Sequence, residues 1–320
     1  MTPIIIIGSG IAGLACARRL VEVGLRPIIF DKGHNIGGRV ATKHAHGLQF
    51  DHGAQYVNAR GEAFAAVLGG LVNAGFATSW SDKTRRLGIV GTPGMSALAK
   101  GLSAGLDIRQ GSQVTKITFD NNNWILKINE KDYQTTRLVI TIPAPQVPAL
   151  IGIDHPLVTK IGTVNFAPCL TLMIAVQGKA PFIIYNNPKN SLSSVVQNSS
   201  KSGRSSGGLS TWVAHAGVAM SKNHLAKKGS EIVDLMLPLL CAELGISLGQ
   251  VTQATAHRWL YGCVTTPLGK PFLRNKHSNL YLGGDWCIGS NIEAAWTSGT
   301  ALANDIIYSN SEDRKGSGST

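Results

Sequence analysis

The segment Gly8-Ser-Gly-Ile-Ala-Gly13 constrains this chain more than any other feature of its sequence. It follows the apolar run Ile4 to Ile7, which is typical of a buried strand, and it precedes the helical pattern from Leu14 to Val23. A second apolar run, Ile29-Phe30, comes next. The order strand, glycine turn, helix, strand predicts a βαβ unit whose turn and helix N-terminus approach the pyrophosphate of a dinucleotide.

An acidic residue ends the second predicted strand. Asp31 lies eighteen residues after Gly13, where its carboxylate can accept hydrogen bonds from ribose hydroxyls. An ordinary glycine turn with a surface aspartate is the alternative, and strand, spacing and acid together favour binding. We therefore predict an adenine dinucleotide site that includes Gly8, Gly10, Ala12, Gly13, Asp31 and Lys32.

The length of 320 residues suggests two domains in an α/β fold. We predict a discontinuous Rossmann-type domain (1–58, 93–148 and 276–308) and an inserted mixed-sheet substrate domain (59–92 and 149–275). In the insert, apolar runs predict strands around a polar loop, Asn186 to Gly208, and then a helix, Glu231 to Leu244. The polar residues 309–320 are predicted to be a disordered tail.

Composition excludes several classes of protein. With 43% hydrophobic and 15% charged residues the chain is not disordered, and none of its apolar runs reaches the ~18 residues of a membrane span. The five cysteines are scattered without a CxxC pair, so neither a disulfide framework nor a metal site is expected, and a cytoplasmic location is the default.

Charge is unevenly distributed. The net charge is +12, and the stretch from His155 to Ser230 holds eight Lys or Arg residues and no Asp or Glu. This stretch should attract anions. Nucleic acid is not an expected partner, because the basic residues are spread out and are not interleaved with aromatic residues in a recognisable motif.

The doublet and arginine at Gly37-Gly38-Arg39 resemble the GGR motif of the flavin-dependent amine oxidase superfamily. The resemblance implies a two-domain flavoprotein that binds FAD non-covalently, with Gly38 and Arg39 at the FAD pyrophosphate. Arginine suits this position because its planar fork can pair with two phosphate oxygens.

Further motifs resemble the renalase branch of this superfamily, particularly its bacterial members. They are Asp51-His-Gly-Ala-Gln-Tyr56, His257-Arg-Trp259, Gly284-Asp-Trp-Cys287 and Glu293-Ala-Ala-Trp-Thr-Ser-Gly299. By this resemblance Gly53, Ala54, Gln55 and Tyr56 lie near the flavin ring, Gly284 and Asp285 hold the ribityl chain and pyrophosphate, and the helix that begins near Asn291-Ile292 faces the N1 and O2 edge of the flavin. Asp285 could equally be a helix N-cap. Val114 would pair with adenine through its backbone, although a plain core valine is the alternative.

The same resemblance places Asn198 against a nicotinamide-like ring and makes Tyr56 and Trp259 candidate substrate contacts. A solvated loop is the alternative for the residues around Asn198, and core packing is the alternative for Trp212, Trp259 and Trp296. No lysine that reaches flavin N5 is identified, and His215 and His257 are not assigned as bases, because direct hydride transfer to flavin needs none.

The implied activity is oxidation of the 2- and 6-dihydro isomers of NAD(P)H, small anionic dinucleotides, with O2 as the second substrate and H2O2 as its product. Two alternatives stay open at this point. One is oxidation of a small amine on the same flavin, and the other is a flavin-binding protein without turnover.

Overall fold

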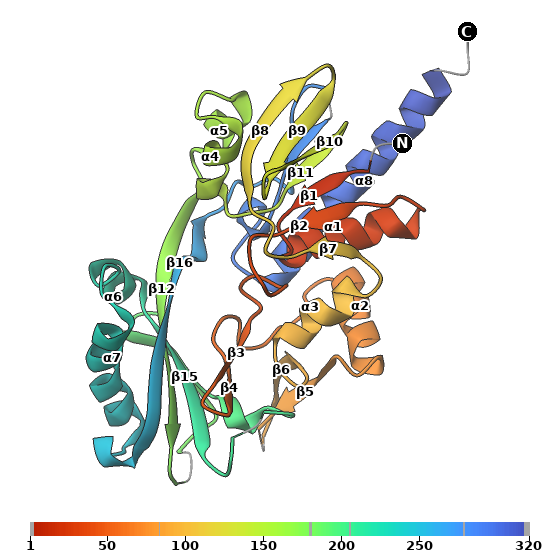
Figure 1. Ribbon diagram of the computed structural model, residues 1–320. Helices are drawn as coiled ribbons and strands as arrows, with labels where there is room; N and C mark the ends of the chain where they lie inside the picture. Colours follow the sequence, from red (N-terminus) through yellow and green to blue (C-terminus); the bar gives the residue numbers. More distant parts are fainter. Residues whose placement is uncertain (1–2, 83, 179–180, 205, 278, 317–320) are drawn as a thin grey trace. The chain divides into compact units, whose positions relative to one another are not determined.

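The computed structural model describes residues 3–82, 84–178, 181–204, 206–277 and 279–316, and the chain forms two compact units (Figure 1). Unit 1 comprises Met1–Gly38, Ala99–Asn165 and Val264–Thr320, and unit 2 comprises Arg39–Leu98 and Phe166–Cys263. The α/β prediction is confirmed. The units differ from the predicted domains in two ways. Residues 39–58 and 93–98, expected in the dinucleotide-binding domain, fall in unit 2, and residues 149–165 and 264–275, expected in the substrate domain, fall in unit 1.

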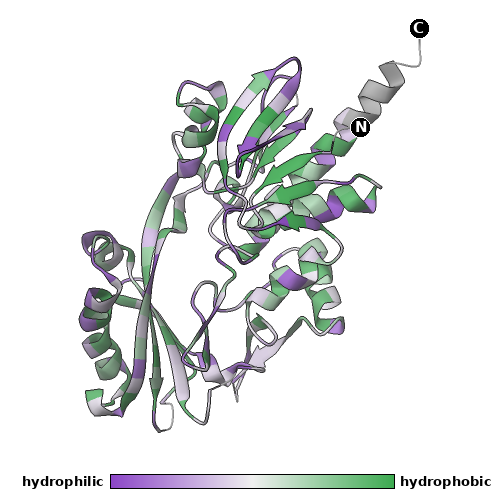
Figure 2. Ribbon diagram, in the orientation of Figure 1, coloured by the Kyte–Doolittle hydropathy of each residue, from purple (hydrophilic) through white to green (hydrophobic). Residues whose placement is uncertain are grey.

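Unit 1 is built on a six-stranded sheet in the order β17-β18-β11-β1-β2-β7. Its strands are β1 (Ile5–Ile7), β2 (Ile28–Phe30), β7 (Asp107–Arg109), β11 (Leu138–Ile140), β17 (Leu273–Arg274) and β18 (Leu280–Leu282). All neighbouring pairs are parallel except β17 with β18. The central strands are fully apolar (Figure 2), as a parallel sheet buried on both faces requires.

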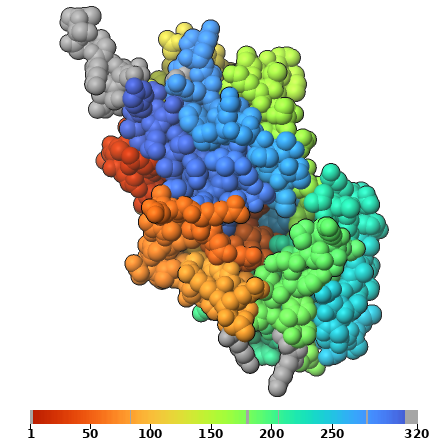
Figure 3. Space-filling model, turned by 180° about the vertical axis from the view of Figure 1, so that it is seen from behind, coloured from red at the N-terminus to blue at the C-terminus, as the bar shows by residue number. Residues whose placement is uncertain are grey.

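Two helices pack together beside this sheet. They are α1 (Ile11–Glu22) and α8 (Ile292–Gly316), so residues near the two ends of the chain lie side by side on the surface of unit 1 (Figure 3). The predicted tail is corrected here, because α8 continues to residue 316, and the sequence from residue 309 to residue 315 contains no proline or glycine. Residues 317–320 lie outside the described part of the chain.

Unit 1 also carries a three-stranded antiparallel sheet with the order β10-β9-β8. Its strands are β8 (Val114–Asp120), β9 (Asn123–Ile128) and β10 (Lys131–Thr135). Four short helices complete the unit: the 3-10 helix η1 (Ala144–Gln146), α4 (Pro148–Ile151), α5 (Pro156–Ile161) and the 3-10 helix η4 (Asp285–Cys287). Helix α3 (Ser96–Ser103) includes residues of both units.

Unit 2 contains a five-stranded sheet in the order β13-β14-β15-β12-β16. Its strands are β12 (Asn165–Val176), β13 (Ile184–Asn186), β14 (Leu192–Gln197), β15 (Ser210–Ala216) and β16 (Val251–Thr266). Helix α7 (Gly229–Leu244) covers one face, and its Ile232, Met236 and Leu240 share an apolar core with the strands. The predicted polar loop from Asn186 to Gly208 was wrong in part, since Leu192, Val195 and Val196 are buried and form β14.

Smaller elements complete unit 2. They are the hairpins β3 (Thr42–Ala45) with β4 (Leu48–Asp51) and β5 (Ala77–Ser81) with β6 (Arg86–Gly91), the helices α2 (Glu62–Asn73) and α6 (Val218–Asn223), and the 3-10 helices η2 (Asn198–Ser200) and η3 (Leu248–Gln250). Within the part of the chain that the structure describes, no helix has both the length and the apolar character needed to cross a bilayer.

Candidate functional site

The glycine turn of unit 1 joins β1 to α1. Gly8 has φ +105°, which a glycine adopts readily, and a Cβ on Gly13 would collide with the Gly8 carbonyl oxygen. Gly299 of α8 is equally confined, because a Cβ there would collide with the Ala12 carbonyl oxygen. Packing within the protein therefore explains why these positions are glycine.

Gly10 is different. Its φ is −69°, and a Cβ built on it would meet nothing within 4 Å. Helix α1 begins directly after Gly10 with no side-chain cap and no acidic residue in its first turn. The turn thus presents open space and a helix N-terminus, the combination that accepts a phosphate. The residues present fit a dinucleotide pyrophosphate.

Asp31 fixes the same turn. Its Oδ2 accepts hydrogen bonds from the Ser9 amide at 2.6 Å and the Ser9 hydroxyl at 2.7 Å, and its Oδ1 accepts one from the Gly33 amide at 2.7 Å. A carboxylate has about four acceptor positions, so capacity remains for a ribose hydroxyl. Lys32, beside it, is exposed, and its Nζ lies 3.5 Å from Gln146 Oε1.

The C-terminal motif of unit 1 is held by hydrogen bonds from backbone amides to side-chain oxygens. The Gly284 amide donates to Ser298 Oγ at 2.9 Å, and Asp285, at the start of η4, is buried. Asn291 caps α8, because its Oδ1 accepts from the Ala294 amide at 2.8 Å, so the predicted helix start near Asn291-Ile292 is confirmed. Val114 is buried at the start of β8, opposite Ile128.

In unit 2, Arg39 of the GGR motif is joined by a backbone hydrogen bond to the second glycine motif, Asp51 to Tyr56. The Ala54 amide donates to the Arg39 carbonyl at 2.9 Å, and a Cβ on Gly53 would collide with that carbonyl. The Arg39 guanidinium donates to the Gly262 carbonyl at 3.3 Å and lies 6.0 Å from the ring centroid of Phe166.

Asp51 starts the second glycine motif and is fully buried among donors. Its Oδ1 accepts from the Met95 amide at 2.9 Å and from Thr42 Oγ1 at 2.9 Å. Its Oδ2 accepts from Lys201 Nζ at 3.2 Å and from Arg204 Nη2 at 2.6 Å. Burial alone would raise the pKa of Asp51, but the two cations and the Met95 amide outweigh it and lower that pKa.

Three polar residues at a spacing of three hold this motif, and we call Asn198, Lys201 and Arg204 the clamp. Asn198 Nδ2 donates to the Gln49 carbonyl at 2.8 Å, and its Oδ1 accepts from the Asp51 amide at 3.1 Å. Lys201 also donates to Gln55 Oε1 at 2.9 Å.

The clamp changes the interpretation of this loop. Asn198 is fully buried and its amide is bonded at both ends to the backbone of β4, which favours a structural role over the predicted contact with a nicotinamide-like ring. Sequence reasoning missed Lys201 and Arg204, although the 198, 201, 204 spacing and the nearby acidic motif residue Asp51 were visible signals.

Lys201 has a lowered pKa because its side chain is buried. Burial lowers the pKa of Lys201 to about 8, the Arg204 charge acts in the same direction, and Asp51 opposes both. The pKa of Lys201 therefore falls mainly through burial, whereas that of Asp51 falls because of the charges and hydrogen bonds around it. The Lys201 ammonium also lies 5.6 Å from the centroid of the Trp80 ring.

A histidine and tryptophan cluster adjoins the motif. His52 stacks on Trp259 at 5.1 Å and meets His257 edge-on at 4.7 Å, and Trp259 Nε1 donates to the His52 carbonyl at 2.9 Å. Burial, helped by the His257 charge, lowers the pKa of His52 to about 3, and burial lowers that of His215 to about 4. Tyr56 lies 5.7 Å from Trp80, ring to ring. Of the predicted tryptophans, Trp212 is buried in the core.

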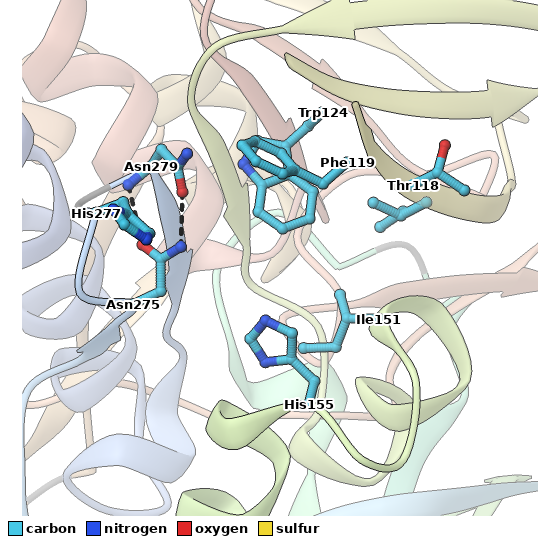
Figure 4. Close-up of a pocket in the computed structure, with 9 residues that line it drawn as sticks. Thr118, Phe119, Trp124, Ile151, His155, Asn275, His277 and Asn279 are labelled. Carbon is cyan, nitrogen blue, oxygen red and sulfur yellow. Dashed lines mark hydrogen bonds between the residues drawn. The ribbon is translucent and has the colours of Figure 1, made fainter. Parts of the chain in front are cut away.

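Two further observations concern metal binding and cavities. Among the described residues, no group of three or more His, Cys, Asp or Glu side chains could hold a metal ion. A pocket of about 410 Å³ lies in unit 1 (Figure 4), but it contains none of the predicted cofactor residues. Its lining is Ile117, Thr118, Phe119, Trp124, Ile151, His155, Asn275, His277 and Asn279.

Comparison with protein families gives two matches. Residues 6–71 match the NAD(P)-binding Rossmann-like domain, and residues 60–307 match the model described as flavin-containing amine oxidoreductase. "Probable polyamine oxidase 4" of Arabidopsis thaliana is 40% identical over 55 residues, which is 17% of this chain and 11% of that protein.

Solved structures with the same fold cover almost the whole chain. The "Putative protoporphyrinogen oxidase" from Exiguobacterium sp. 255-15 aligns with a TM-score of 0.75 and 14% identity, over 95% of this chain and 98% of that one. Wild-type putrescine oxidase bound to putrescine aligns with a TM-score of 0.69 and 12% identity, over 96% and 99%. At these identities the likeness concerns the fold alone.

Proposed function

Because the chain belongs to the family of flavin-containing amine oxidoreductases, we propose that it oxidises the 2- and 6-dihydro isomers of NAD(P)H on a non-covalently bound FAD. Membership makes the chain an FAD-dependent oxidoreductase. Bound FAD would supply the acceptor for the hydride of the substrate, and the two electrons of that hydride together with two protons would reduce O2 to H2O2.

The proposal assigns the chain's own residues to binding and orientation. In unit 1 the Gly10 turn and the α1 N-terminus would receive the pyrophosphate, Asp31 the ribose, and Gly284 and Asp285 the ribityl chain. In unit 2 Arg39 would add its fork to the pyrophosphate, and Gly53 to Tyr56 would line the ring. His52 and His215, with their lowered pKa values, are uncharged at neutral pH. A direct hydride transfer does not require either histidine to donate or accept a proton.

The observation that carries the choice of donor is charge. The stretch from His155 to Ser230 has no acidic residue, and six of its eight basic residues remain after Lys201 and Arg204 are assigned to the clamp. Positive charge favours an anionic dinucleotide over a cationic amine. The test is anaerobic mixing of the FAD-loaded protein with each donor, where loss of the visible flavin absorption identifies the reductant.

A second candidate is oxidation of a small amine. The sequence match to a polyamine oxidase favours it, although that match spans only 55 residues. The same experiment separates the candidates, since this alternative requires bleaching by putrescine or a polyamine and no response to reduced dinucleotides.

A further inference from the structure

The two basic residues of the clamp and Asp51 form a buried group whose charges do not balance. Asp51 supplies one carboxylate, and Lys201 and Arg204 supply two cations, so the group carries one net positive charge when Lys201 is protonated. The side chains of Asp51, Lys201 and Arg204 are completely buried. A buried net charge is costly and acts over a longer distance than an exposed one, because water does not screen it.

The clamp is also bonded to the motif that the resemblance places at the flavin ring. Lys201 donates to Gln55 Oε1, and Gln55 Nε2 donates to the carbonyls of Asp51 at 2.5 Å and Gly53 at 3.0 Å. Arg204 continues to the Gly91 carbonyl at 2.6 Å. The segment from Asp51 to Gln55 therefore cannot move without breaking contacts to the clamp.

We propose that Lys201 and Arg204 are positioning residues that hold a net positive charge behind the segment Gly53 to Tyr56 and thereby favour the reduced, anionic form of bound FAD. This inference rests on the proposed function, since it needs flavin beside that segment. Negative charge develops on flavin during reduction, and a fixed positive charge in the wall of the site stabilises the reduced state relative to the oxidised one.

Lys201 is the titratable member of the clamp. The charged groups that face it are Asp51 on β4 and Arg204 on its own loop, with His215 on β15 close enough to feel its charge. Its pKa of about 8 puts the loss of its proton within reach of experiment. Reduction of FAD should raise this pKa, because the anionic flavin attracts the ammonium.

The test measures the midpoint potential of the FAD-loaded protein against a reference dye, with dithionite as reductant. Lys201→Met leaves Asp51 and Arg204 as a neutral pair, so it should lower the potential, whereas Lys201→Arg should keep it close to wild type. Lys222→Met removes the same charge from the exposed surface of α6 and should leave the potential unchanged. A Lys201→Met protein that binds FAD with the wild-type potential would overturn the inference.

The wild-type protein gives a test that needs no variant to fold. Between pH 7 and pH 9.5 the potential should fall more steeply, by the slope of one additional proton per two electrons, over the range where Lys201 holds a proton only in the reduced state. A single unchanging slope would overturn the inference. Failure of wild type to bind FAD would overturn the proposed function as well, so the two failures are distinguishable.

Discussion

The backbone amide of Ala54 donates a hydrogen bond to the backbone carbonyl of Arg39 at 2.9 Å. The two motifs that the resemblance assigns to the pyrophosphate and to the flavin ring are therefore joined through main-chain atoms. Gly53 completes the junction, since no side chain fits against the Arg39 carbonyl. Because this backbone hydrogen bond uses no side-chain atom of Arg39, the guanidinium can be replaced without removing the bond.

We expect Arg39→Ala to weaken FAD binding by roughly ten- to a hundredfold, since a charge-assisted hydrogen bond to phosphate contributes about 1.5 to 3 kcal/mol. Arg39→Lys should recover only part of this loss, because a point charge cannot form the two-pronged contact. Equilibrium titration of apoprotein with FAD measures both. Wild-type affinity in both variants would remove Arg39 from the site.

Gly10 and Gly13 form a matched pair of tests. Gly13→Ala should destabilise the apoprotein by about 1 to 3 kcal/mol, because its Cβ collides with the Gly8 carbonyl. Gly10→Ala should leave the apoprotein near wild-type stability, since its Cβ meets nothing, and should weaken FAD binding. Urea denaturation and FAD titration separate the effects. A Gly10→Ala protein with normal FAD affinity contradicts the assignment of this turn to the pyrophosphate.

The βαβ unit could be predicted from sequence because its signals are local. A glycine turn between an apolar run and a helical pattern leaves few alternatives, and α1 and β2 follow as expected. Strand β14 was missed because its flanks are rich in Ser, Asn and Lys, and burial of Leu192 and Val195 depends on pairing with β13 and β15. Tertiary pairing outweighed local composition there.

The candidate site divides in the same way. The turn glycines and the α8 start were predictable because close packing and capping depend on neighbouring residues. The clamp was not, because Lys201 and Arg204 are about 150 residues away from Asp51 along the chain. Basic residues in a polar loop are ordinarily solvated, and only the fold shows that these two are buried against a carboxylate.

Acid should destabilise the protein through His52. Its pKa in the folded state is about 3, below the unfolded value of ~6.5, so between these values only the unfolded chain binds the proton. The stabilisation is complete above pH 6.5 and is lost as the pH falls toward 3, at up to ~1.4 kcal/mol per pH unit. Urea denaturation at pH 7, 6 and 5 checks this. His52→Asn should make the slope shallower, with the rest of it coming from His215, and exposed His44→Asn should leave the slope unchanged. Equal slopes in all three proteins would contradict this account.

FAD should be released when the protein is precipitated with acid. Burial raises the pKa of the Cys287 thiol to about 12, so this cysteine near the predicted ribityl site is not a thiolate and is a poor candidate for attachment to flavin. The yellow colour should appear in the supernatant. Colour that stays in the pellet, with flavin on a tryptic peptide, would show a covalent link.

The central claim is that the electron donor is a 2- or 6-dihydro isomer of NAD(P)H, and anaerobic reduction kinetics test this claim most directly. FAD-loaded protein mixed with borohydride-reduced NAD, which contains the 2- and 6-dihydro isomers, should bleach and yield one NAD per flavin. Ordinary 4-dihydro NADH should react far more slowly, because its reactive carbon would be misplaced for hydride transfer. The bimolecular rate should fall as salt rises, since an anionic donor approaches a basic surface. Rapid bleaching by putrescine, with no response to the reduced dinucleotides, would contradict the account and establish the amine oxidase alternative.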